Sequence, residues 1–307
     1  MSLSIFGASL LMLLPVSLTR GCSGSGKVQQ AMSAIVFPPH DTLQRTLPDG
    51  IALWADVYRL EPNVDEPSKG GKPVLVCMHM TGSSRGEYGR LAAEMMALGV
   101  NVMSVDLRSG GPGEIADRKT GVRSGTMNET WKAAKTQLGR EPTYQEAYPD
   151  VVAAVAWARE LFPYSRVGIV GSSYSASFAL KYAAENPTMV DVAVAMSPGE
   201  YMPPWSIREM IQHLSVPSYI TCGNTAADVN HAQPIALAII DQAQVRTFWP
   251  EDHNIVGDHG SKTLHIFGAV NHDRQWAEFK AGIQPVLKPL KPRELAARRE
   301  AAKKAAK

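Results

Sequence analysis

Gly171-Ser172-Ser173-Tyr174-Ser175 is the stretch that decides the fold of this 307-residue chain. It follows an apolar run at residues 167–170, typical of a buried strand, and precedes residues 176–182, which favour a helix. A strand that turns at once into a helix forces a cramped backbone on the central serine, so only small residues fit two positions before and after it. Gly171 and Ser175 are both small, although Ser175 stands where this motif usually has glycine. Ser173 is therefore a candidate nucleophile.

Short, mostly apolar runs elsewhere in the chain predict the rest of a sheet. They occupy residues 74–78, 100–105, 190–196, 219–222 and 245–249. Between them, apolar residues recur at helical spacing over residues 88–98 and 151–161. Buried parallel strands read as continuous apolar runs, and their alternation with helices predicts an α/β fold with a doubly wound, mostly parallel sheet.

Two further segments shape the expected domain. Residues 43–46 and 51–58 flank Pro48-Asp49-Gly50, which predicts an antiparallel hairpin at the start of a single domain over residues 40–287. Residues 107–147 hold no comparable apolar run, which favours a small lid-like insertion over the strand ends. A surface excursion without function remains the alternative.

The charges of the chain are unevenly distributed. Its net charge is +2, but residues 288–307 carry eight Lys and Arg against two Glu, so this tail is +6 and the rest is 2 − 6 = −4. A mildly acidic body offers no basic surface for nucleic acid. We expect the Ala- and Lys-rich tail to be a marginal helix or disordered, and solvated without a partner.

The amino-terminal segment is typical of an exported protein. Residues 3–18 are apolar, and Cys22 precedes Ser23-Gly24-Ser25-Gly26, so residues 1–21 resemble a signal peptide of the lipoprotein type, with a linker at residues 22–39. This pattern predicts a periplasmic or membrane-anchored lipoprotein with lipid on Cys22, or alternatively a secreted protein. Cys77 and Cys222 lie in apolar runs and are expected to be buried thiols.

A serine hydroxyl becomes a nucleophile when an imidazole takes its proton and a carboxylate orients that imidazole. In the chain order nucleophile, acid, histidine, Asp228 follows the apolar run 219–222, and His259 follows the last expected strand. His253 is the alternative base, because it lies closer to that strand. Glu200, after the preceding strand, is the alternative acid.

The loop His79-Met80-Thr81-Gly82 follows the expected strand 74–78 and comes before the first large helix. Such a loop supplies one backbone N–H to a developing oxyanion, and the residue after the nucleophile supplies another. We therefore expect the amides of Thr81 and Tyr174 to be the donors. His79 is expected to orient this loop through hydrogen bonds.

Together these features resemble the α/β-hydrolase superfamily over residues 40–287. The stretches at residues 106–111, 171–176 and 197–201 resemble its dienelactone hydrolase branch, with Ser173 in place of the cysteine nucleophile. The resemblance implies a small-molecule ester or lactone as substrate, and neither a metal ion nor an organic cofactor. It suggests a substrate pocket near Met80, Arg108, Glu200 and Tyr201, with Arg108 either binding a substrate carboxylate or lying in a surface loop. A peptidase or amidase of the same fold and a non-catalytic binding lipoprotein are the alternatives.

Overall fold

The computed structural model describes residues 37–60, 65–66, 69–89, 91–113, 126–250, 259–264 and 272–305. They lie in one compact unit that begins at Val36. The expected signal peptide, Cys22 and His253 fall outside the described residues, so export, lipidation and the alternative base stay predictions.

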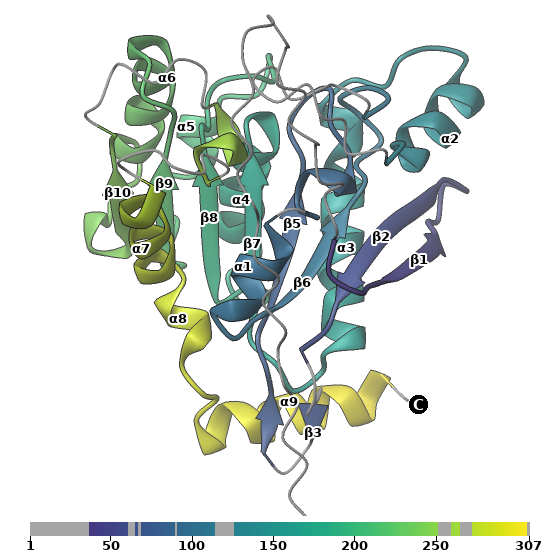
Figure 1. Ribbon diagram of the computed structural model, residues 1–307, viewed down its shortest axis with the longest axis vertical. Coiled ribbons are helices and arrows are strands. Elements are labelled where there is room, and N and C mark those ends of the chain that lie inside the picture. The colour runs from purple at the N-terminus through teal and green to yellow at the C-terminus, as the bar shows by residue number, and fades with distance from the viewer. Residues whose placement is uncertain are drawn as a thin grey trace, which may run out of the picture. The chain divides into compact units, whose positions relative to one another are not determined.

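The described residues form one large sheet and one small ribbon (Figure 1). The large sheet has eight strands in the order β1-β2-β6-β5-β7-β8-β9-β10. Their bounds are β1 (Asp41–Thr46), β2 (Ala52–Tyr58), β5 (Val74–Met78), β6 (Asn101–Val105), β7 (Val167–Ser172), β8 (Val192–Met196), β9 (Ser218–Thr221) and β10 (Val245–Phe248). The ribbon pairs β3 (Asp65–Glu66) with β4 (Gly70–Gly71).

The pairing directions confirm the predicted sheet. β1 and β2 form the expected antiparallel hairpin, and β2 also runs antiparallel to β6, whereas β6, β5, β7, β8, β9 and β10 are parallel. All five residues of β5 and of β8 are buried, as the apolar runs predict for strands covered on both faces.

Helices cover both faces of this sheet. Those described are α1 (Ala92–Ala97), α2 (Glu129–Leu138), α3 (Tyr148–Leu161), α4 (Tyr174–Glu185), α5 (Ile207–Met210), α6 (Ala226–Leu237), α7 (His272–Gly282), α8 (Gln284–Leu287) and α9 (Pro292–Ala305), with 3₁₀ turns η1 (Arg85–Glu87), η2 (Gln145–Ala147), η3 (Gln242–Gln244) and η4 (Gly260–Leu264). One core contains apolar residues of α3 and α4, and the other contains residues of α1 and α7. The sheet is therefore doubly wound. None of the helices in the described residues is long and apolar enough to cross a bilayer.

Part of the expected insertion is a sheet-flanking element and not a cover over the strand ends. Helix α2 lies beside β2 in Figure 1, and Thr130 Oγ1 accepts a hydrogen bond from Trp54 N–H at 3.0 Å. Asn128 caps this helix by accepting from Trp131 N–H at 2.8 Å. The residues that follow α2 turn toward the strand ends and contribute to a pocket described below.

The tail forms helix α9, one of the two expected outcomes, and its described residues are mostly exposed, but it also contacts the body of the protein. Arg166 pairs with Glu294 at 2.8 Å, and Arg298 pairs with Asp191 at 3.1 Å. Leu295 is also buried. Arg166 and Asp191 immediately precede β7 and β8, so α9 is attached at the amino-terminal ends of these parallel strands, below the sheet in Figure 1. Acidic and basic groups outside the tail thus provide partners that its own composition does not reveal.

Candidate active site

Ser173 lies at the strained turn between β7 and α4 that the sequence predicts. Its backbone has φ 60° and ψ −123°, a left-handed φ that is unusual for a residue other than glycine. The small residue before it is required, because a Cβ on Gly171 would lie 2.1 Å from the carbonyl oxygen of Ser175. Ser173 N–H donates to Met196 O on the neighbouring strand at 2.8 Å, which fixes this conformation.

Ser175, the departure from the usual glycine, has a structural role. Its buried hydroxyl accepts from Ser172 N–H at 2.8 Å, and it lies 2.9 Å from both Met78 O and Ser172 O, to which it can donate. The hydroxyl therefore ties the turn to the carboxyl end of β5. A side chain at this position is tolerated because its polar atom is hydrogen-bonded inside the fold.

The three residues predicted to act together are joined by hydrogen bonds. His259 Nε2 lies 2.7 Å from Ser173 Oγ, and His259 Nδ1 lies 2.6 Å from Asp228 Oδ1. Asp228 belongs to the first turn of α6, where its N–H donates to the capping Thr225 hydroxyl at 3.1 Å. With Nδ1–H donating to the carboxylate, Nε2 is free to accept the serine proton. Asp228 and Ser173 are buried, while the His259 side chain is 31% exposed and so can be reached by a substrate.

Serine hydroxyls hold the loop that carries His259. Gly260 N–H donates to Ser197 Oγ and Ser261 N–H donates to Ser172 Oγ, each at 2.9 Å. Gly260 has φ +67°, and its lack of a side chain leaves room for Ser172. Ser172 and Ser197 end the adjacent strands β7 and β8, or lie directly after them. Neither serine was singled out from the sequence, because a backbone-binding hydroxyl leaves no periodic pattern.

The two proposed oxyanion donors come from the start of α4 and from the loop after β5. Tyr174 is the first residue of α4, where a helix N–H has no intrahelical acceptor. In the opposite loop, Met80 N–H donates to Glu87 Oε2 at 2.8 Å, which leaves Thr81 N–H as the next amide along.

His79 has the loop-orienting role expected for it. Its Nε2 accepts from Leu107 N–H at 2.9 Å, so Nδ1 carries the proton and donates to Met80 O at 2.9 Å. The buried ring thereby links the loop to the segment that follows β6.

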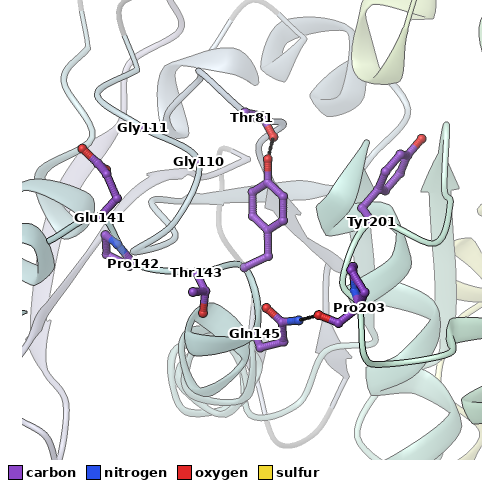
Figure 2. Close-up of a pocket in the computed structure, with 10 residues that line it drawn as sticks. Thr81, Gly110, Gly111, Glu141, Pro142, Thr143, Gln145, Tyr201 and Pro203 are labelled. Carbon is purple, nitrogen blue, oxygen red and sulfur yellow. Dashed lines mark hydrogen bonds between the residues drawn. The ribbon is translucent and has the colours of Figure 1, made fainter.

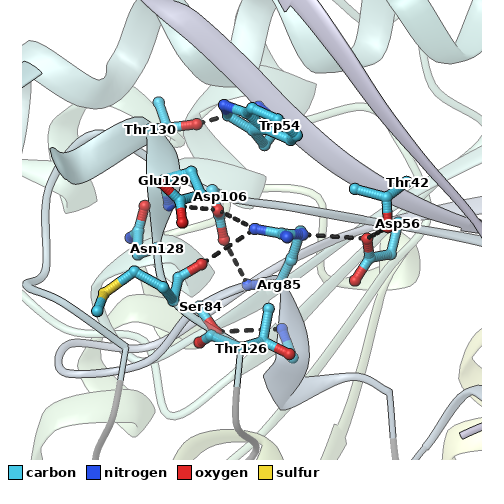
Figure 3. A network of polar contacts seen from close by, with 12 residues as sticks. Thr42, Trp54, Asp56, Ser84, Arg85, Asp106, Thr126, Asn128, Glu129 and Thr130 are labelled. Carbon is cyan, nitrogen blue, oxygen red and sulfur yellow. Dashed lines mark hydrogen bonds and ion pairs between the residues drawn. The ribbon is translucent and has the colours of Figure 1, made fainter. Parts of the chain in front are cut away.

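A buried ionic network surrounds Arg85 at the start of η1, shortly after this loop along the chain (Figure 3). Arg85 donates through Nη1 to Asp106 at 2.6 Å and through Nε to Asp56 at 3.0 Å. Burial raises the pKa of the Asp106 carboxyl, although the Arg85 guanidinium opposes this shift. The network fixes η1 against β2 and β6, and η1 ends at Glu87.

An open pocket of about 370 Å³ lies beside Tyr174, the residue after the nucleophile, although Ser173, Asp228 and His259 are not part of its lining (Figure 2). Its lining consists of Thr81, Gly110, Gly111, Glu141, Pro142, Thr143, Tyr144, Gln145, Tyr201 and Pro203. The Tyr144 ring stacks on that of Tyr174, with ring centroids 4.3 Å apart. The insertion is held across the pocket at two points, since Thr81 Oγ1 and Tyr144 OH are hydrogen-bonded at 2.7 Å and Gln145 Nε2 donates to Pro203 O at 2.7 Å. Tyr144 and Gln145 were not identified from the sequence.

Of the four residues expected to line the pocket, Tyr201 does so and the other three do not. Arg108 neither binds a substrate carboxylate nor lies in a surface loop. Its buried guanidinium binds Asp150 at 2.6 Å and Asp49 at 2.5 Å. Glu200 accepts from Ile207 N–H at 2.7 Å at the start of α5 and pairs with Arg208. The Glu200 carboxylate is therefore bound by residues at the start of α5, whereas Asp228 is the carboxylate that binds His259. Met80 contributes to the loop through its backbone and not as a residue of the pocket wall.

Comparisons with known proteins give structural neighbours only. No family model and no curated protein matches this sequence. Among solved structures, the esterase Pf2001 of Pyrococcus furiosus is 16% identical with a TM-score of 0.57, over 82% of this chain and 94% of its own. A dienelactone hydrolase from Anabaena variabilis is 13% identical with a TM-score of 0.50, over 70% of this chain and 87% of its own. At these identities the likeness concerns the fold, and with the strand order and the strained Ser173 turn it shows that this chain has the α/β-hydrolase fold.

Proposed function

We propose that this protein is a serine hydrolase that cleaves small carboxylic esters or lactones through Ser173, His259 and Asp228. The observation that carries the proposal is the unbroken hydrogen-bonded series from Asp228 through His259 to Ser173, at 2.6 Å and 2.7 Å, ending on a serine with φ 60°. A serine hydroxyl hydrogen-bonded to a partly exposed imidazole, which a carboxylate orients, is what nucleophilic catalysis requires.

In the first half of the reaction, Ser173 Oγ attacks the ester carbonyl carbon as His259 Nε2 takes the hydroxyl proton. The carbonyl oxygen becomes an oxyanion, which the amides of Thr81 and Tyr174 stabilise. His259 then gives the proton to the leaving alcohol as the carbon–oxygen ester bond breaks. The acyl group remains on Ser173, and Asp228 stabilises the imidazolium throughout.

In the second half, His259 takes a proton from water, and the resulting hydroxide attacks the acyl carbon. The tetrahedral species collapses, the proton returns to Ser173, and the carboxylic acid leaves. His259 reaches solvent through its exposed edge. The chemistry needs no group beyond these side chains and backbone amides.

The adjoining pocket supports a small-molecule substrate over a polymer. A volume of about 370 Å³ is at the lower end for ligand sites. Its walls combine the tyrosine rings of 144 and 201 with backbone glycines and the polar ends of Thr143 and Gln145. Such a lining suits a short acyl or alcohol group with some polar character.

The test combines covalent labelling with turnover. A fluorophosphonate probe should label the wild-type protein at Ser173, as mapped by peptide mass spectrometry, and p-nitrophenyl acetate should be hydrolysed. Ser173→Ala should abolish both, and His259→Ala should lower kcat by about 1,000-fold or more. His253→Ala and Glu200→Gln are matched controls that should retain activity. Labelling at another residue, or none in folded protein, would contradict the proposal.

A further inference from the structure

Glu87 lies between two loops that the proposed reaction uses. It is the last residue of η1, and its carboxylate has a hydrogen bond on each oxygen. Oε2 accepts from Met80 N–H at 2.8 Å, and Oε1 accepts from Ser261 Oγ–H at 2.5 Å. Met80 belongs to the oxyanion loop, and Ser261 follows His259 by two residues. The Glu87 side chain thus connects the loop that supplies an oxyanion donor to the loop that carries His259.

The hydrogen bond from Met80 N–H to Glu87 decides which amide of the oxyanion loop can bind the oxyanion. With Met80 N–H committed to Glu87, the loop has Thr81 N–H as the next donor. His79 fixes the same residue from the other side, through Met80 O. Met80 is therefore held at both its N–H and its carbonyl, and this determines where Thr81 points.

Beyond the hydrogen bonds of the His259 ring itself, three contacts of Gly260 and Ser261 hold the histidine loop in the described part of the chain. Two are the hydroxyls of Ser172 and Ser197, which accept the N–H groups of Ser261 and Gly260. Both of these hold the loop to strand ends β7 and β8. The third is the Ser261 hydroxyl, which is fully buried and donates to Glu87. Of the three, the Glu87 contact is the one that joins the histidine loop to the oxyanion loop.

We propose that Glu87 is a positioning residue that holds His259 and the Thr81 amide in mutual register for the transition state. This inference rests on the proposed serine hydrolase activity. The base and the oxyanion donors must act on the same tetrahedral carbon, and a misplacement of about 1 Å lowers the rate by about 100-fold. An ionised carboxylate between two donors forms charge-assisted hydrogen bonds, which are shorter and stronger than neutral ones.

The chemistry of the site explains why a glutamate is suited to it. Both neighbours are donors, so the bridging group must accept twice, which an ionised carboxylate does. Glutamine has one acceptor oxygen, so its amide would satisfy Met80 N–H and force the Ser261 hydroxyl to turn. Aspartate is one methylene shorter and cannot span the same gap. Alanine removes both contacts.

Steady-state kinetics on p-nitrophenyl acetate test the proposal, with Glu87→Gln, Glu87→Ala, Ser261→Ala and the Glu87→Ala/Ser261→Ala double variant. We expect kcat to fall by about 3- to 10-fold in Glu87→Gln and Ser261→Ala and by about 100-fold in Glu87→Ala, with KM within twofold. Because Glu87→Ala already severs the Ser261 contact, Ser261→Ala should add less than twofold in that background. The rate of fluorophosphonate labelling should fall in parallel.

The matched control is Glu160→Gln, the same chemical change at a mostly exposed side chain paired with Arg45. It should leave kcat unchanged. Urea unfolding identifies the folded variants, and if Glu87→Ala does not fold, Glu87→Gln and Ser261→Ala decide the question. Wild-type rates in both of these folded variants, a loss confined to KM, or full additivity in the double variant would overturn the positioning role.

The same measurements separate this inference from the proposed function. If wild-type protein neither hydrolyses the ester nor is labelled at Ser173, the hydrolase proposal fails. If wild type is active and Ser173→Ala is not, while the Glu87 and Ser261 variants behave as wild type, only the positioning role fails.

Discussion

A Cβ atom on Gly260 would lie 2.3 Å from Ser172 Oγ, so the residue after His259 touches the residue before Ser173. Ser172 Oγ is also the acceptor for Ser261 N–H, and it cannot turn away without losing that bond. We predict that Gly260→Ala lowers kcat for p-nitrophenyl acetate by about 100-fold, because the histidine loop must shift. Stability should also fall by about 1–3 kcal/mol in urea unfolding, from the positive φ and the clash.

Gly139 is the matched control for this substitution. It has the same φ of +67° at the end of α2, but nothing lies within 4 Å of a Cβ built there. Gly139→Ala should therefore carry the backbone penalty of about 1 kcal/mol and leave kcat unchanged. Equal kcat values for the two alanine variants would show that the contact with Ser172 has no catalytic consequence.

Ser175 should matter for stability more than its place in the motif suggests. Its hydroxyl satisfies Ser172 N–H and lies within hydrogen-bond distance of Met78 O, both in the protein interior. Ser175→Gly restores the usual motif, yet it leaves the buried Ser172 N–H without its acceptor, while Met78 O keeps the Tyr88 hydroxyl as a donor. We expect it to lower the free energy of unfolding by about 1–3 kcal/mol, measured in urea. Thr136→Ala, which removes an exposed hydroxyl on α2, should change it by less than about 0.5 kcal/mol. Greater stability with glycine would contradict this view of Ser175.

The parts of the fold that the sequence predicts are those with a local cause. Apolar runs specify the central strands β5 and β8 because strands covered on both faces favour apolar residues, whereas the edge strand β10 is mostly exposed. Small residues around Ser173 specify the elbow because of a clash within five residues. The order of strands then carries Asp228 and His259 to the same edge of the sheet, and this explains why three residues far apart in sequence could be named together.

The errors have a different origin, in partners that are distant along the chain. Arg108 follows a strand end, as a substrate-binding arginine would, but Asp150 at the start of α3 captures its guanidinium. Glu294 of the tail meets Arg166 in a similar way. Glu87 was missed because its two partners, Met80 and Ser261, are joined only in the folded chain. None of these contacts follows from periodicity.

The buried pair of Asp150 and Arg108 predicts a pH dependence of stability. Burial raises the pKa of Asp150 from 3.8 to about 6, although Arg108 acts to lower it. The raised value means that the protonated carboxyl is favoured in the folded state. The stability that this raised pKa contributes is therefore complete below about pH 4, and it is lost as the pH rises through 6. Asp150→Asn removes this titration, so the stability difference between wild type and variant should be smaller at pH 8 than at pH 5.

Urea unfolding of both proteins at the two pH values measures this difference, which should change by about 1 kcal/mol. The side chain of Asp41 is 64% exposed, so Asp41→Asn is the control for the substitution itself. A difference that stays constant from pH 5 to pH 8 would mean that Arg108 dominates and keeps Asp150 ionised over this whole range.

Gln145 should limit the size of the substrate. Its Nε2 donates to Pro203 O at 2.7 Å, and this bond joins the insertion to the loop after β8 across the pocket (Figure 2). Gln145→Ala removes both the bond and the bulk of the side chain. We expect the ratio of kcat/KM for p-nitrophenyl hexanoate to that for the acetate to rise by about 3- to 10-fold, since each buried methylene contributes about 0.8 kcal/mol where space admits it.

Gln137 offers a close control for Gln145, because it also donates from Nε2 to a backbone carbonyl, that of Asp49 at 3.0 Å, and it does not line the pocket. Gln137→Ala should leave the hexanoate-to-acetate ratio within twofold of wild type. If both variants raise the ratio equally, the cause is general loosening of the insertion. If neither does, the Gln145–Pro203 contact does not limit the acyl length of the substrate.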